Sequence, residues 1–468
     1  MSFVFYDTET TGTKVPFDQI LQFAAIRTDS EFNEIDRFEI RCKLQDHVVP
    51  APMAMHITGV TAARLTEVSL PSHYEMVRAI REKLLSWSPS IFIGYNSLEF
   101  DEPLLRQALY KTLHSPYLTN TSGNSRSDAL RAVQATSLFT PDVFKIPEGK
   151  KGPSFKLDQI APLNGFDHKH AHDAMSDVEA TIFLCRIVAE KSPEVWSSFM
   201  RFSQKSAVID YVTSENIFCF TDFFFSKPYS AIVTTIGDDP DNGSNFYIYD
   251  LSINPEDLAD LSHDSLIKRL GRSPKPIRKL KSNAAPILML TEDALDIAAA
   301  KKYDLEELER RANLLQGNEE LRQRLIASTQ STYKERETSP HVEERIYDHF
   351  FSEVDQCILD EFHSVPWENR PPLLEKLQDV RLRELGQRLI HTERPDLMEK
   401  SECIKHDRLR AQRILGSNDN KSWLTLPEAI QDIDKLLESA NKETALFLNE
   451  HKKLLLERLA GVNTILVS

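Results

Sequence analysis

The sequence predicts an α/β domain with a mixed central sheet, followed by a β-containing module and an all-helical C-terminal region. Strand-like and helix-like segments alternate up to about residue 185, which is typical of an α/β domain. Aromatic and β-branched runs follow, and the end of the chain has helical periodicity. Because 468 residues exceed what one core usually fills, we expect three domains, at 1–190, 194–340 and 342–464.

The first domain should begin with strands on which helices then pack. Its predicted strands are 3–6, 20–27 and 90–95. Its predicted helices are 102–113 and 174–189. Residues 117–151 are rich in Asn, Ser, Gly and Pro, so we expect a long loop there with some helix at 128–136.

The second and third domains differ in pattern. The second should be mostly β, with strands at 217–225, 230–236 and 246–251, and should lead into helical sequence at 304–328 and a polar linker at 329–340. From Val342 onward, apolar residues recur every four positions, which predicts one amphipathic helix. These apolar residues are Ile346, Phe350, Val354, Ile358 and Phe362.

Composition restricts the class of protein. The net charge of −15 argues against binding a polyanion through bulk charge, so any nucleic-acid contact must be local. The five cysteines are scattered, with no C-x-x-C pair, which favours a reducing cytoplasm over a disulfide or zinc framework. No apolar run resembles a signal peptide or a membrane span, so we expect a soluble protein without a membrane partner.

Two carboxylates follow the first strand. Asp7 and Glu9 are two residues apart, so on an extended chain their side chains project to the same side. Carboxylate oxygens are ligands that a hard cation such as Mg²⁺ prefers. An acidic, solvated turn is the alternative for such a pair alone, but the longer string Asp7-Thr8-Glu9-Thr10-Thr11-Gly12 is much less common.

Two further acids could either stabilise a helix or belong to the same site. Asp101 lies where a strand and loop lead into a helix, and alone it could be an N-cap that stabilises the helix by about 1 kcal/mol. Asp177 lies five residues after His172 at the start of the 174–189 helix, where a negative charge also favours the helix dipole. Together with Asp7 and Glu9, however, these residues form a set of four acids and one histidine.

The order and spacing of this set resemble the DEDD exonuclease superfamily, in its histidine branch. Pro153-Ser154-Phe155-Lys156-Leu157 and Ala171-His172-Asp173-Ala174-Met175-Ser176-Asp177 are similar to the bacterial exodeoxyribonuclease I family. The resemblance implies a ribonuclease H-like nuclease domain, an SH3-like domain and a helical C-terminal domain. It further implies 3′-to-5′ degradation of single-stranded DNA to 5′-mononucleotides, in DNA repair and recombination.

The resemblance also implies the roles of individual residues. Asp7, Glu9 and Asp177 would hold two Mg²⁺ ions, for which Mn²⁺ could substitute, and Asp101 would complete the set through water. His172 would be the general base, taking a proton from water as the pH approaches neutrality. Glu9 and Lys156 would contact the substrate, where Lys156 stands in place of the family's basic residue, often Arg, and lacks its bidentate fork.

The metal ions would lower the pKa of the attacking water and stabilise the leaving 3′-oxygen. Another exonuclease of the same branch, acting on RNA or as a proofreader, is an alternative, although such enzymes are usually little more than the nuclease domain. A non-enzymatic nucleic-acid-binding scaffold is a second alternative, but all five catalytic positions carry the required residue types.

Positive charge is concentrated in one segment without acids. Its residues are Lys268, Arg269, Arg272, Lys275, Arg278, Lys279 and Lys281. This run could track the backbone of single-stranded DNA, or bind the acidic C-terminal tail of the single-stranded-DNA-binding protein, a partner that the resemblance implies, or be a solvated loop. The family likeness also implies a monomer.

Aromatic side chains supply weaker signals. An aromatic run could stack with bases, but is more often sheet core, which we favour. Its members are Phe218, Phe220, Phe223, Phe224, Phe225 and Tyr229. Phe17, Arg106 and Tyr117 are candidates for the lining of the nuclease cleft.

Overall fold

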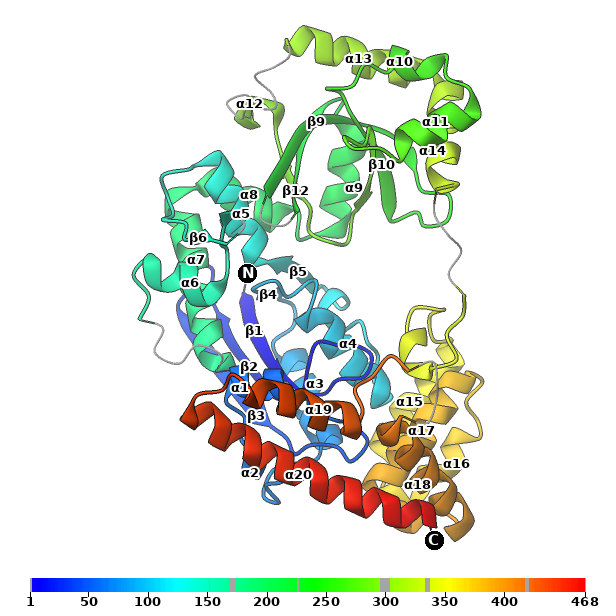
Figure 1. The fold of residues 1–468 in the computed structure, drawn as a ribbon. Helices are drawn as coiled ribbons and strands as arrows, with labels where there is room; N and C mark the ends of the chain where they lie inside the picture. The colour runs from blue at the N-terminus through cyan, green and yellow to red at the C-terminus, as the bar shows by residue number, and fades with distance from the viewer. Residues whose placement is uncertain are drawn as a thin grey trace.

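The computed structural model describes residues 2–150, 152–167, 173–224, 227–294, 304–332, 337–416 and 421–467. Figure 1 shows an α/β body in blue to cyan, a sheet with flanking helices in green above it, and helices in yellow to red below it. No helix in these ranges is long and apolar enough to cross a membrane.

The first sheet has five strands in the order β3-β2-β1-β4-β5. Its strands are β1 (Phe3–Thr10), β2 (Ile20–Thr28), β3 (Glu34–Arg41), β4 (Ile91–Gly94) and β5 (Ser125–Asp128). β1 runs antiparallel to β2 and parallel to β4, and β4 runs parallel to β5. The predicted α/β domain with a mixed sheet is therefore confirmed, and β1 lies at its centre.

Helices cover both faces of this sheet. The helices of this domain are α1 (Pro52–Thr58), α2 (Ala62–Leu65), α3 (His73–Ser86), α4 (Asp101–Lys111), α5 (Ala129–Phe139), α6 (Leu157–Leu163) and α7 (Ala174–Lys191). The domain also has a 3-10 turn at Leu118–Asn120 and a small hairpin of β6 (Glu148–Gly149) and β7 (Gly152–Pro153). Phe3 and Phe5 pack against α7. Val4 and Tyr6, on the opposite face of β1, pack against α3 and α4. This two-sided burial explains why β1 opens with a continuous apolar run.

The middle region begins with two helices, α8 (Pro193–Arg201) and α9 (Lys205–Ser214), which the prediction of a mostly β module missed. Its sheet has the order β11-β10-β9-β8-β12, and every ladder is antiparallel. The strands are β8 (Phe218–Phe224), β9 (Lys227–Asp238), β10 (Asn245–Asp250), β11 (Ile277–Lys281) and β12 (Ile287–Met289). The helices that flank it are α10 (Glu256–Ala259), α11 (His263–Leu270), α12 (Thr291–Ala294), α13 (Leu305–Gly317) and α14 (Glu319–Gln330).

The C-terminal region is helical, as predicted. Its helices are α15 (Glu353–Ser364), α16 (Pro371–Leu374), α17 (Val380–Glu393), α18 (Lys400–Leu415), α19 (Leu426–Leu437) and α20 (Lys442–Val467), with 3-10 turns at Val342–Arg345, Trp367–Asn369 and Pro395–Leu397.

The single amphipathic helix predicted from Val342 is wrong. Helix α15 begins only at Glu353, because the Ser352 hydroxyl accepts a hydrogen bond from the Asp355 amide at 3.1 Å and so caps the helix there. Phe350, which the four-residue period assigned to the buried face, precedes the helix and is 77% exposed.

Both outer regions contact the α/β domain. Arg126 and Arg131 donate hydrogen bonds to the carbonyls of Asn283 and Ala284 in the middle region, at 3.1 and 2.5 Å. Helix α20 lies beside α1 and α2 (Figure 1), where His451 Nε2 is 2.9 Å from the Val60 carbonyl. The α/β domain is therefore held from two sides.

Candidate metal centre

Strand β1 places Asp7 and Glu9 beside helix α7. A carboxylate oxygen from each of Asp7, Glu9 and Asp177 lies within 4.8 Å of the others, and this is the one such group of metal-ligating side chains in the described part of the chain. Asp7 and Glu9 share a face because they are two residues apart on a strand. Asp177 reaches them because α7 packs on β1 through its first turns.

The fourth acid lies next to this group. Asp101 is the first residue of α4, not the N-cap, which is Phe100. Its carboxylate accepts a hydrogen bond from the Thr8 hydroxyl at 2.5 Å, so it is tied to β1 between the two acids of that strand. Asp101 does not belong to the 4.8 Å group.

A buried acid holds the loop that leads to Asp101. The Asp128 carboxylate accepts hydrogen bonds from the amides of Asn96 and Leu98 at 2.8 and 3.1 Å. Asn96 has a φ of 61°, a left-handed conformation that Asn adopts more readily than most residues. Asp128 therefore fixes the loop between β4 and α4. Sequence reasoning missed it, although it ends a strand within the loop-like stretch.

The loop after β1 is locked in a similar way. The Asp18 carboxylate accepts hydrogen bonds from the Thr11 hydroxyl at 2.7 Å and from the Lys14 amide at 2.6 Å. A Cβ atom at Gly12 would lie 2.7 Å from the same carboxylate, so only glycine fits there. This close approach explains the glycine that ends the Asp7 to Gly12 string.

Asp173 precedes α7 and is held by two other strands. Its carboxylate accepts hydrogen bonds from Arg41 of β3 at 2.7 Å and from Gln22 of β2 at 3.2 Å. Burial alone would raise the pKa of Asp173, but Gln22 and Arg41 outweigh it and hold the pKa below its ordinary value. These contacts anchor the start of the helix that carries Asp177. Sequence reasoning missed Asp173, although it stands beside His172 in the motif.

The electrostatics of the acids suit a cation. Burial, and then Asp101 and Asp177, raise the pKa of Asp7 well above its ordinary value. Burial, and then Asp177 and Asp101, raise the pKa of Glu9 to about 9. Burial raises the pKa of Asp101 to about 7, against the hydrogen bond from Thr8. Several buried carboxylates thus repel one another, and their oxygens are the donors that a divalent ion would draw together.

Glu102 adjoins this site but lies in a different environment. It accepts hydrogen bonds from four side chains at 2.6 to 3.1 Å, namely Tyr6, Arg106, Thr119 and Arg126. No sequence pattern marks these residues as a group, because they come from four separate elements.

The predicted site has two further residues, His172 and Lys156. His172 lies outside the described residues. Lys156 is the N-cap residue of α6 and its side chain is exposed. The preceding residue, Phe155, accepts a hydrogen bond at its carbonyl from the Tyr95 hydroxyl at 2.5 Å, which ties this segment to the loop before α4.

Only part of the basic run is an exposed loop, which holds Arg272 and Lys275 between α11 and β11. Lys268 and Arg269 belong to α11, and Arg278, Lys279 and Lys281 to β11. Lys279 forms an ion pair with Asp239 at 2.7 Å, and the Arg278 guanidinium lies 3.7 Å from the centre of the Tyr229 ring. The side chains of Lys268, Arg272, Lys275 and Lys281 are exposed.

The preference for core in the aromatic run is confirmed in part. Phe218 and Phe220 are buried, whereas Phe224 is 44% exposed and Phe225 lies outside the described residues. Phe17 is also buried, packing against Trp423 of the C-terminal region at 5.3 Å between ring centres, so it does not line an open cleft.

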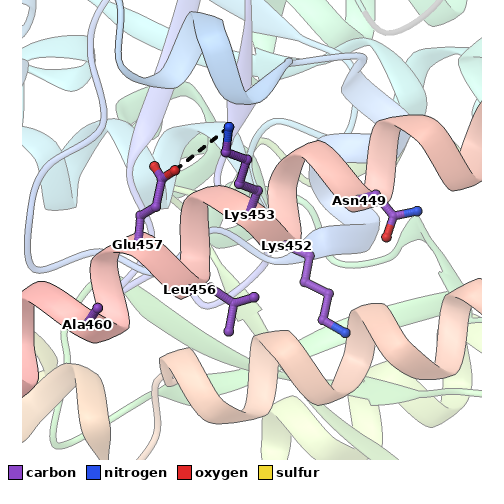
Figure 2. A pocket seen from close by; sticks show the side chains of 6 residues that line it. All are labelled: Asn449, Lys452, Lys453, Leu456, Glu457 and Ala460. Carbon is purple, nitrogen blue, oxygen red and sulfur yellow. Dashed lines mark ion pairs between the residues drawn. The ribbon is translucent and has the colours of Figure 1, made fainter.

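Two hollows of the structure do not coincide with the predicted site. Figure 2 shows a shallow one of about 460 Å³ on α20, bordered by Lys452, Lys453, Leu456 and Glu457. A deeper one of about 650 Å³ lies between the α/β domain and the C-terminal helices, with Glu343 in its wall. Glu343 already forms ion pairs with Arg388 and Arg413 in the same wall.

Comparison with known families agrees with this fold and site. Residues 4–184 match the exonuclease family model, and residues 340–461 match the model of the exonuclease I C-terminal domain. Fold and site together thus define a nuclease of the exonuclease class, whose fold uses divalent metals, joined to a C-terminal domain found in exonuclease I.

Individual relatives narrow this class. Exodeoxyribonuclease I of Escherichia coli is 29% identical over 408 residues, covering 82% of this chain and 84% of the relative. Exonuclease I of Methylocaldum szegediense is 25% identical, with a TM-score of 0.84 over 98% of this chain and 99% of the other. E. coli exonuclease I solved with a dA16 oligonucleotide shares the fold, with a TM-score of 0.85 over the same shares at 24% identity. The resemblance to bacterial exodeoxyribonuclease I is therefore confirmed.

Proposed function

We propose that this protein degrades single-stranded DNA from the 3′ end and releases 5′-mononucleotides, in DNA repair and recombination. The observation that carries this proposal is the group of Asp7, Glu9 and Asp177, in a chain that also has the exonuclease I C-terminal domain. That second domain favours this activity over an RNA-trimming or proofreading exonuclease, which would need only the first.

Asp7, Glu9 and Asp177 would hold two Mg²⁺ ions, or Mn²⁺ in their place, with Asp101 acting through water. Such ions lower the pKa of an attacking water and stabilise the leaving oxygen. The residues of the chain do the rest. His172 would take the proton from the water. Asp173, which Arg41 and Gln22 bind, would hold the start of α7 in place. Glu9 and Lys156 would contact the terminal nucleotide.

The middle region would be the SH3-like domain of this family, within proposed boundaries of 194–340. Its exposed Lys268, Arg272, Lys275 and Lys281 would contact either the DNA backbone or an acidic protein tail. A solved exonuclease I structure is a complex with SSB-Ct, which supports the tail of the single-stranded-DNA-binding protein as a partner here. A cytoplasmic monomer fits this role.

The test is hydrolysis of end-labelled single-stranded DNA, duplex DNA and RNA, first with Mg²⁺ and then with EDTA. We expect shortening of single-stranded DNA from its 3′ end, with Mg²⁺ only. A matched pair of variants, Asp177→Asn and Asp142→Asn, separates the site from a general loss of acidic charge, because Asp142 is an exposed acid of the same domain. A protein that degrades RNA faster than DNA, or is active in EDTA, would refute the proposal.

A further inference from the structure

We propose that Tyr117, Tyr347 and Phe350 form an aromatic platform that stacks with bases of the single strand beyond its scissile end. Arg106 connects this platform to the carboxylate site. The inference rests on the proposed function and deepens it, because it names where the strand is held away from the metals.

The platform brings two domains together. The ring of Tyr117, from the α/β domain, lies 5.4 Å from the ring of Phe350, which precedes α15. The guanidinium of Arg106 lies 5.1 Å from the centre of the Tyr117 ring. Tyr347 also interacts with this guanidinium: burial lowers the pKa of Arg106, but Glu102 and then Tyr347 raise it above its ordinary value. In Figure 1 the yellow segment before α15 runs beside α4.

The two rings of this segment are strongly exposed. Phe350 is 77% exposed and Tyr347 is 55% exposed. Large apolar side chains gathered on a surface mark an interaction site more often than chance exposure does. Their neighbours Ile346 and Phe351 are instead packed in the core of the C-terminal region, so the segment is not simply unfolded from it.

The backbone that carries the exposed rings is anchored. Arg381 is fully buried and donates hydrogen bonds to the carbonyls of Arg345 and His349, at 2.6 and 3.0 Å. These two carbonyls bracket Tyr347. A ring held in place on a fixed backbone loses little conformational freedom on binding, which favours stacking with a ligand.

The platform is close to the four acids. Arg106 follows Asp101 by five residues on α4, about 7.5 Å of helix rise. Its Nε donates to Glu102 at 2.8 Å, and Glu102 is the residue next to Asp101. A strand whose end lies at the carboxylates would therefore meet Arg106 and the three rings within its next few nucleotides.

The chemistry of the platform fits unpaired bases. Every base has a π-face, so stacking on aromatic rings gives affinity without sequence preference. A duplex would keep its bases stacked on each other and could not use the rings. The platform would thus help to select single-stranded DNA, and would give the C-terminal region a direct part in substrate binding.

The test uses the full-length double variant Tyr347→Ala/Phe350→Ala, with Val354→Ala as a control. Val354 is 51% exposed, is apolar but not aromatic, and lies in the first turn of α15, four residues after Phe350. Oligothymidylate carrying one 2-aminopurine at successive positions from the 3′ end, in EDTA, reports stacking as fluorescence quenching. We expect quenching at one or two internal positions to be lost in the double variant alone.

The same variant should bind the oligonucleotide about 5- to 150-fold more weakly, the range for loss of one stacked base. Hydrolysis at saturating DNA should stay unchanged, and the rise in KM should disappear for the shortest oligonucleotides still cleaved. Phe350→Leu, which keeps apolar area but not the π-face, should reproduce most of the loss.

Three results would overturn the platform. They are unchanged quenching in the double variant, an equal effect of Val354→Ala, and a KM penalty that persists for the shortest substrates, since this would mean that the rings act through Arg106 on the acids. If instead the wild type fails to hydrolyse single-stranded DNA but still quenches, the proposed function fails and the binding site stands.

Discussion

Asp101 and Glu102 are adjacent at the start of α4, yet they lie in opposite electrostatic environments. Asp101 stands among other acids, and burial raises its pKa to about 7. Burial would also raise the pKa of Glu102, but Arg106 and Arg126 outweigh it and the pKa falls below its ordinary value. One turn of one helix thus carries both an uncompensated and a compensated buried charge.

This difference distinguishes an acid that stabilises the fold from acids that form a functional site. Three donors reach Oε1 of Glu102 and the Tyr6 hydroxyl donates to Oε2, so the folded protein itself stabilises the charge. Within the described ranges no ion pair compensates Asp7, Glu9 or Asp101, and burial together with repulsion between the acids raises the pKa values of Asp7 and Glu9. Such clusters persist where a ligand supplies the missing charge, and this is why they mark functional sites.

The largest effect should come from Asp177→Asn. We expect hydrolysis of single-stranded DNA to fall by about 10³-fold or more, because one ligand of the cation is lost. The metal-free protein should be as stable as the wild type or more stable, by up to about 1 kcal/mol, because one repelling charge is gone. Steady-state rates and urea unfolding in EDTA measure the two quantities.

If Asp177→Asn lost activity together with several kcal/mol of stability, the contrast between the metal-site acids and Glu102 would be wrong. It would mean that Asp177 holds the fold as Glu102 does. Asp7→Asn provides the same test from β1.

Glu102→Gln should have the opposite signature. Removing this charge leaves Arg106 and Arg126 without their buried counter-ion, so we expect a loss of about 3–5 kcal/mol in the free energy of unfolding. Glu99→Gln is the matched control. Glu99 lies three residues earlier, its side chain is 72% exposed, and its ion pair with Arg131 is longer, at 3.4 Å. Its effect should stay below about 0.5 kcal/mol. Equal effects of the two changes in urea unfolding would contradict the assignment.

Added metal should stabilise only the uncompensated region. At a concentration of Mg²⁺ about 100 times its Kd, the wild type should gain about 2.7 kcal/mol, seen as a rise in Tm. Asp177→Asn should lose most of this gain, and Glu99→Gln should keep it. A full metal-dependent shift in Asp177→Asn would place the cation elsewhere.

The sequence predicted the fold best where local pattern and packing agree. The strands at 3–6 and 20–27 and the helices at 102–113 and 174–189 correspond to β1, β2, α4 and α7 within a few residues. The prediction of a helix from Val342 failed because Ser352 caps α15 and because the buried Arg381 binds the carbonyls of the segment before it. Neither contact leaves a periodic signal.

The acids of the candidate site could be found because their order and spacing match a known pattern. The residues that hold these acids in place could not be found from the sequence. Thr8, Asp128 and Asp173 act through hydrogen bonds to residues that are 30 or more positions away, and a single sequence does not show which distant residues meet. The grouping of Glu102 with Arg126 was hidden for the same reason.

The last prediction concerns a third kind of buried group, one whose hydrogen-bond partners suit its neutral form. His363 stacks on His114 with ring centres 3.7 Å apart, and its two nitrogens lie 3.0 Å from the Tyr74 hydroxyl and the Leu113 carbonyl, across the junction with the α/β domain. Burial lowers the pKa of His363 to about 4, against the hydrogen bond to Leu113.

The folded protein therefore binds fewer protons at His363 than the unfolded chain between about pH 6.5 and pH 4. His363 should therefore lower the free energy of unfolding by about 3 kcal/mol as the pH falls through this window. His363→Gln, which can keep one hydrogen bond but cannot gain the proton, should reduce this pH dependence by the contribution of His363, and the exposed His263→Gln should leave it unchanged. An unchanged slope of unfolding free energy against pH in His363→Gln would contradict this prediction. It would mean that the buried His363 does not contribute to the pH dependence of stability.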